Sequence, residues 1–113
     1  GKIEVLNEKQ PPIVQRYDWR KVKILKNEEM AEGLYIVEEI QAKAEGSSRG
    51  YDSPKSLENR ARIILRKKAA NLNAKYVLIT NKNVTIAFGE LPSATLTGIA
   101  YTDEKLPKKS DNQ

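Results

Sequence analysis

The sequence predicts an α+β domain in which one long amphipathic helix packs on a four- to five-stranded sheet, either largely antiparallel or mixed. Apolar residues recur at helical spacing over residues 54–72, and short runs rich in strand-forming residues flank this segment on both sides. The chain has 113 residues, of which 39% are hydrophobic, which suits a single domain. We expect the order β-β-α-β-β-β over residues 21–102.

Two strands are expected before the helix. Residues 22–25 form a short apolar run. In residues 34–44, the apolar positions fit either a helix, through Ile36, Ile40 and Ala44 at every fourth position, or a strand with one apolar face. The opening Leu-Tyr-Ile-Val of this segment is rich in strand formers, so we favour the strand.

The helix carries the clearest local signals. Ser53 is a suitable N-cap, and Pro54 fits the first helical position, where its missing N–H has no cost. Lys68 interrupts the apolar arc, and its alkyl stem is expected to reach outward from the edge of that face. Asn73 follows the last turn, where a left-handed residue is needed. The apolar side chains, within an arc of about 140°, are Leu57, Ala61, Ile64, Leu65, Ala69 and Leu72.

Three strands are expected after the helix. Residues 76–80 (YVLIT) are the strongest candidate, and the Asn-Lys-Asn triplet at 81–83 is expected to turn the chain into a partner strand over 84–88. After a second turn, residues 94–102 alternate as the last strand. Gly98 in this strand indicates a bulge or the close approach of another backbone.

The composition limits the classes of function. The chain has no Cys and no His, which excludes Cys/His metal sites, thiol chemistry and histidine acid–base relays. Its paired carboxylates at 28–29, 38–39 and 103–104 are adjacent in sequence, whereas a two-carboxylate centre places them on opposite sides of a cleft. We therefore expect no catalytic residue, no cofactor-binding residue and no metal ligand, and we expect that the protein is not an enzyme.

The formal net charge is +5, and four basic residues of the helix are candidate interaction residues: Arg60, Arg62, Arg66 and Lys67. A nucleic-acid interface needs such residues on one face, preferably with stacking aromatic side chains, and none lies among them. We therefore favour a solvated helix face. A solvated Arg66 predicts that Arg66→Ala lowers the free energy of unfolding by less than about 0.5 kcal/mol.

Tyr17 and Trp19 are the remaining candidate interaction residues, at the end of a polar lead-in over residues 1–20. Trp19 is the single Trp of the chain. It is either an exposed anchor for a partner or a side chain that folds back over one edge of the core. We favour the second interpretation. Residues 103–113 are expected to form a polar tail.

Residues 65–78 (LRKKAANLNAKYVL) resemble the LxxxAAxLGAnxVV signature of YbjQ-like domains and of the signalling domain of the RcsF outer-membrane lipoprotein. Residues 96–101 (LTGIAY) resemble the terminal GxAY strand of these domains, and residues 40–46 resemble an upstream strand that ends in small residues. The resemblance spans about residues 22–102. Asn73 stands where the signature has Gly, and the chain lacks the Cys residues that form disulfides in RcsF-type domains. It also lacks the His and Cys that would support the heavy-metal binding ascribed to YbjQ-like proteins.

The resemblance implies a non-enzymatic lipoprotein domain in the periplasm or at the outer membrane, which acts through protein contacts in envelope sensing or maintenance. Residues 1–20 would then be a tether that follows a lipidated Cys, and the lost N-terminal lipid would be the only membrane contact. The implied partners are a protein of the cell envelope and further copies of the chain. Two alternatives are a small basic module that binds nucleic acid and an oligomeric structural subunit built by pairing of sheet edges.

Overall fold

The computed structural model describes residues 17–47, 52–86 and 89–104. In chain order, its elements are η1 (Trp19–Lys21), β1 (Lys23–Leu25), η2 (Glu28–Ala31), β2 (Tyr35–Glu45), α2 (Pro54–Asn71), β3 (Tyr76–Thr85) and β4 (Ser93–Thr102). Most of the expected tether, nearly all of the expected tail and the end of the strand expected over 84–88 lie outside the described residues.

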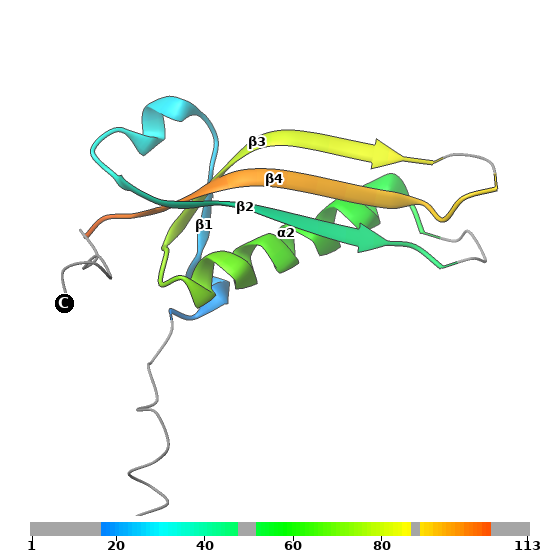
Figure 1. Cartoon of the computed structure of the whole chain (residues 1–113), viewed down its shortest axis with the longest axis horizontal. Helices are drawn as coiled ribbons and strands as arrows, with labels where there is room; N and C mark the ends of the chain where they lie inside the picture. Colours follow the sequence, from blue (N-terminus) through cyan, green and yellow to red (C-terminus); the bar gives the residue numbers. More distant parts are fainter. Residues whose placement is uncertain (1–16, 48–51, 87–88, 105–113) are drawn as a thin grey trace, which may run out of the picture.

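The four strands form one mixed sheet in the order β1-β3-β4-β2. β1 pairs parallel with β3, and β4 pairs antiparallel with both β3 and β2. α2 lies across one face of this sheet (Figure 1). The α+β class, the mixed sheet and the strand interpretation of residues 34–44 are therefore confirmed.

The turn expected at residues 81–83 is wrong, because β3 continues through them as a single strand to Thr85. Asn81 and Asn83 stay paired with β4, opposite Thr97 and Thr95. β4 is as long as β3 and pairs with it from Ser93 to Tyr101, so ladder hydrogen bonds outweigh the local turn preference of asparagine. The described residues therefore form a four-stranded sheet, within the expected four to five strands, and the expected order β-β-α-β-β-β becomes β-β-α-β-β.

Both ends of α2 follow the local sequence signals. The Ser53 hydroxyl accepts a hydrogen bond from the Ser56 N–H at 3.1 Å, and Pro54 occupies the first turn. Beyond the C-terminus, Asn73 has a φ of 58°. The N–H groups of Asn73 and Ala74 donate to the carbonyls of Ala70 and Ala69, each at 2.9 Å. This is a Schellman motif, and it confirms the expected left-handed residue.

The main core lies between α2 and the sheet. Its helix face consists of Leu57, Ala61, Leu65, Ala69 and Ala70, all of them buried. Three of these residues are alanines, so the helix backbone lies close to the sheet. The opposite face of the sheet has a smaller apolar cluster, made by Leu25, Leu78 and Tyr101 and covered in part by Ala31 and Leu34. No described helix is long and apolar enough to cross a membrane.

Gly98 of β4 is required by the close approach of β3. A Cβ atom on Gly98 would lie 2.8 Å from the Leu78 carbonyl oxygen and 2.9 Å from Cγ1 of Val77. The pairing register shifts beside it, because Ile79 is opposite Gly98 while Asn81 is opposite Thr97. The expected bulge and close approach are therefore both confirmed, with the extra residue in β3.

Candidate functional site

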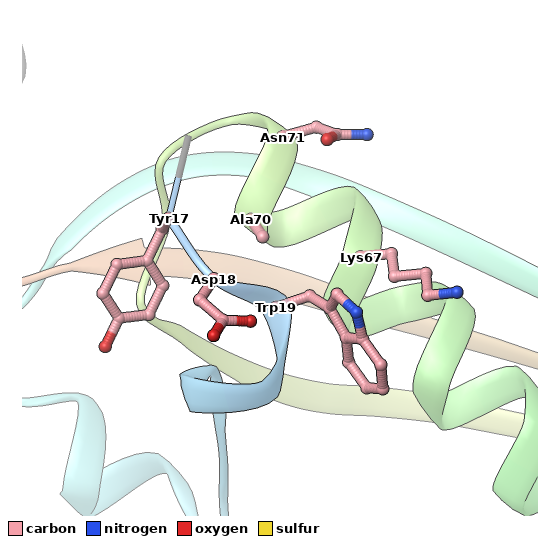
Figure 2. Close-up of a pocket in the computed structure, with 6 residues that line it drawn as sticks. All are labelled: Tyr17, Asp18, Trp19, Lys67, Ala70 and Asn71. Atoms are coloured by element: carbon pink, nitrogen blue, oxygen red, sulfur yellow. The ribbon is translucent and has the colours of Figure 1, made fainter. Parts of the chain in front are cut away.

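A pocket of about 290 Å³ opens beside the C-terminal half of α2. It is lined by Tyr17, Asp18, Trp19, Lys67, Ala70 and Asn71 (Figure 2). We call it the Trp19 pocket. The indole of Trp19 lies along the helix near Lys67, and Tyr17 stands on the other side of Asp18 (Figure 2). Three of the six predicted interaction residues, Tyr17, Trp19 and Lys67, thus line one pocket.

The segment that carries Trp19 is fixed by local hydrogen bonds. The Asp18 carboxylate caps η1 by accepting from the Arg20 N–H at 3.0 Å. The Tyr17 N–H donates to Oδ1 of Asn73 at 3.1 Å, which joins the start of this segment to the end of α2. Trp19 is half-buried and packs against the main core. The interpretation that Trp19 folds back over the core is therefore confirmed, although part of its ring still lines the pocket.

Two cations lie against the Trp19 ring. Cζ of Arg66 is 5.2 Å from the ring centroid, and Nζ of Lys67 is 5.1 Å from it. Both distances are within the range of cation–π attraction. The guanidinium of Arg66 also donates to two backbone carbonyls, from Nε to Val22 at 3.0 Å and from Nη2 to Arg20 at 2.8 Å.

The expectation that Arg66 is solvated is therefore wrong. η1 and its C-cap residue Val22 lie against the helix at this turn and present two carbonyl groups to it, and Arg66 donates to both. Its fork of N–H donors can reach two acceptors at once, which a lysine cannot do with the same geometry. Through these two hydrogen bonds, Arg66 links η1 to α2 and so fixes the position of Trp19 at the pocket.

We expect Arg66→Ala to lower the free energy of unfolding by about 1.5–3 kcal/mol, because charge-assisted hydrogen bonds are lost from a half-buried site. Lys55→Ala, at an exposed position of the same helix, is the control and should change it by less than about 0.5 kcal/mol. Urea unfolding followed by Trp19 fluorescence measures both values. Equal losses in the two variants would contradict the role of Arg66.

The other two predicted arginines are held by acidic side chains. Nη2 of Arg60 lies 3.1 Å from Oδ1 of Asp52, and Nη2 of Arg62 lies 2.9 Å from Oε2 of Glu58. At about 100° per residue, Arg62 lies on one flank of α2 and Arg60 on the other. The structure therefore does not join the predicted basic residues into one patch. Lys67 is the member that lies exposed at the pocket.

Among the described residues, two titratable groups have clearly shifted pKa values, and both shifts come from ion pairs. Hydrogen bonds from Arg62 and Lys82 lower the pKa of Glu58. The hydrogen bond to Asp103, 3.0 Å away, raises the pKa of Lys75, whose Nζ also lies 5.8 Å from the centre of the Tyr17 ring. Both pKa values move away from neutrality, whereas a proton-transfer group needs a pKa near the working pH. These ion pairs support the fold.

The described residues contain no group of three or more acidic side chains close enough to hold a metal ion. A second hollow, of about 470 Å³, lies beside β1 and is lined by Ile24, Leu25, Lys26, Arg62 and Ile79. Sequence reasoning missed this hollow, and it missed Asp18 and Asn71 in the Trp19 pocket. The only signal for Asp18 was its position before Trp19, where an aspartate can cap a short helical turn.

Compared with known proteins, the chain matches no protein family and no curated sequence.

Proposed function

We propose that the chain is a non-enzymatic protein-binding domain, and that its Trp19 pocket receives an apolar side chain from an acidic segment of the partner. The observation that carries this proposal is a half-buried indole held against two cations at the wall of an open pocket. Tryptophan and arginine dominate the energetics of protein interfaces. Because Arg66 and the η1 hydrogen bonds already fix the ring, little ordering is needed when a partner binds.

The charge around the pocket favours an acidic partner. Lys67 is exposed at the pocket, and Arg20 follows Trp19 with 76% of its side chain exposed. Asp18 is the one acidic side chain among the described residues of the lining; it caps η1, and its Oδ1 lies 3.8 Å from Nε of Arg20. The net charge of +5 would steer an acidic segment toward the domain.

A protein is favoured over a nucleic acid because the three predicted arginines of α2 are already engaged. Arg60 and Arg62 pair with carboxylates, and Arg66 binds backbone carbonyls. A nucleic-acid interface needs several free cations along one face to neutralise phosphates. Among the described residues that line the Trp19 pocket, Lys67 is the one cation, beside the two aromatic rings of Tyr17 and Trp19.

We further propose that the domain works in the periplasm or at the outer membrane, attached through an N-terminal lipid, in envelope sensing or maintenance. The support for this location is the resemblance of residues 65–78 and 96–101 to RcsF-like and YbjQ-like domains. The precursor gene tests it: a hydrophobic signal segment that ends in a lipobox Cys is expected. A precursor without such a segment would contradict the location and leave the binding proposal untouched.

Trp19 fluorescence tests the binding proposal directly, because it is the single Trp of the chain and lies in the pocket. The probe is a short peptide with one leucine between glutamates, compared with the same peptide carrying lysines. We expect saturable fluorescence changes with the acidic peptide, and binding about tenfold weaker in Lys67→Glu. Lys55→Glu carries the same change in net charge on the same helix, about 18 Å along its axis, and should bind normally.

Three results would contradict the proposal. The first is an unchanged Trp19 signal at peptide concentrations up to about 1 mM. The second is equal weakening of peptide binding by Lys67→Glu and Lys55→Glu, which would mean that binding depends on net charge and not on the position of Lys67. The third is tight, strongly salt-dependent binding of a single-stranded oligonucleotide in place of the peptide, which would assign the surface to nucleic acid.

A further inference from the structure

The outer edge of β2 carries backbone groups that no strand of the described residues uses. β2 is the last strand of the sheet and is eleven residues long. The Gly46 N–H donates to the Pro92 carbonyl at 2.7 Å, so the even-numbered residues before it direct their backbone groups toward β4. The backbone groups of Glu39, Gln41 and Lys43 therefore point outward from the sheet.

A hydrogen bond from Lys68 independently shows which backbone groups of β2 face outward. Its ammonium group reaches from α2 and donates to the Gln41 carbonyl at 2.6 Å, so this carbonyl faces away from β4. Lys68 is also the residue that interrupts the apolar arc of the helix. It thus covers one acceptor of the free edge, as charged side chains commonly do at exposed strand edges.

We infer that this edge of β2 pairs antiparallel with the same edge of a second copy of the chain, in the register that places Gln41 opposite Gln41. This pairing makes each Glu39 face Lys43 of the other copy, and it does so twice across the two-fold axis. Both side chains project from the sheet face that α2 does not cover, since Ile40 and Ala42 on either side of Gln41 belong to the helix-side core. Opposite charges directly across an antiparallel pair stabilise it.

The neighbouring registers lose this complementarity. Only registers that place odd-numbered residues opposite one another bring outward backbone groups together. One such shift sets Glu39 opposite Gln41, which leaves the charges unpaired. The shift in the other direction sets Glu39 opposite Glu45, which repels twice. Within the described residues, Glu39 and Lys43 take part in no ion pair, so both are available to a second copy.

The geometry also limits the contact. The register of β2 against β4 shifts between Ile36 and Glu38, so the strand bends there and the paired edge is confined to about residues 39–45. A short isologous contact of this kind closes as a two-fold dimer and does not propagate. The expected product is a weak dimer that forms at high protein concentration.

Charge-reversed variants test the register by sedimentation equilibrium at protein concentrations up to about 1 mM. Glu39→Lys and Lys43→Glu each create two like-charge pairs, so each alone should dimerise about tenfold more weakly than the unaltered chain. An equimolar mixture of the two variants restores two opposite-charge pairs and should form a heterodimer. Lys43→Glu is the more decisive test of the two variants. It lowers the net charge from +5 to +3, so it would strengthen dimerisation if net charge alone determined the dimer affinity.

Two further variants complete the experiment. Lys55→Glu also brings the net charge to +3, lies away from the edge, and should dimerise at least as well as the unaltered chain. Lys68→Met keeps the alkyl stem but removes the competing donor, so it should dimerise more strongly. Amide exchange at Gln41 should slow with protein concentration in every variant that dimerises.

A monomer at all concentrations in both the unaltered chain and Lys68→Met would overturn the inference. So would a dimer that Glu39→Lys and Lys43→Glu leave unchanged, or one in which the Gln41 amide exchanges freely. The inference is independent of the proposed function, because Glu39→Lys leaves every residue of the Trp19 pocket in place. Peptide binding without dimerisation, or the reverse, would therefore identify which of the two proposals fails.

Discussion

Leu65→Ala is expected to lower the free energy of unfolding by about 2–5 kcal/mol. The Leu65 side chain is 0% exposed and lies at the centre of the helix face that packs on the sheet. Its neighbours Ala61 and Ala69 are too small to move into the space that the truncation leaves. The loss is a large share of the roughly 5–15 kcal/mol that stabilises a domain of this size. Urea unfolding followed by Trp19 fluorescence measures it.

Ile63→Ala is the matched control, because Ile63 lies two residues earlier in α2 and is 37% exposed. Its truncation removes less buried area and should lower the free energy of unfolding by no more than about 1 kcal/mol. Similar losses for Leu65 and Ile63 would mean that the helix packs through a different face. An unchanged slope of the unfolding transition would show that both variants retain the native fold.

Gly98→Ala is expected to destabilise the domain by about 1–3 kcal/mol or more. The added methyl group would lie 2.8 Å from the Leu78 carbonyl oxygen, which is backbone and cannot move without loosening the β3–β4 pairing. The direction of the change is informative. Where the backbone conformation suits alanine and no clash occurs, replacing glycine by alanine stabilises a protein by about 0.4–1 kcal/mol. The same urea unfolding assay measures the change.

Thr95→Ala is the control for Gly98→Ala, since Thr95 lies on the uncovered face of the same strand and is only half-buried. Its effect should be no more than about 1 kcal/mol. A stabilised Gly98→Ala variant would show that β3 can move away from β4 at this point. The Ile79/Asn81 bulge would then be an adjustable feature of the sheet.

The elements with strong local signals could be predicted from the sequence. Ser53 and Pro54 determine the start of α2 through capping, and Asn73 determines its end because it tolerates a positive φ. The strand over 34–44 could be predicted from the residue types at its start. In each case the deciding interaction lies within a few residues of the signal.

Features that depend on distant segments could not be predicted. The triplet at 81–83 has the composition of a turn, but its pairing with β4 decides its conformation. Arg66 has the sequence context of a solvated residue, but its two carbonyl acceptors, on Arg20 and Val22, come from more than forty positions away. Lys68 was visible as a conflict in the apolar arc, whereas its acceptor on Gln41 lies 27 residues away.

The candidate site shows the same division. Tyr17, Trp19 and Lys67 could each be selected by residue type and position, as an aromatic residue near the core or a cation on a helix. That Trp19 and Lys67 share one pocket depends on how η1 folds across α2. The roles of Arg60 and Arg62 likewise depend on their partners. Asp52 pairs with Arg60 and Glu58 pairs with Arg62, so these two arginines form local ion pairs and do not contribute to a basic patch.

The Lys75 side chain, in contact with both Tyr17 and Asp103, brings together the two points where the polypeptide enters and leaves the described fold. A domain with adjacent entry and exit points can be inserted into a loop of a host protein, or have its ends joined by a short linker, without stretching its own sheet. Tyr17 and Asp103 therefore lie at one corner of the described fold. The end of β3 and the start of β4 lie at the far end of the sheet and point away from this corner (Figure 1).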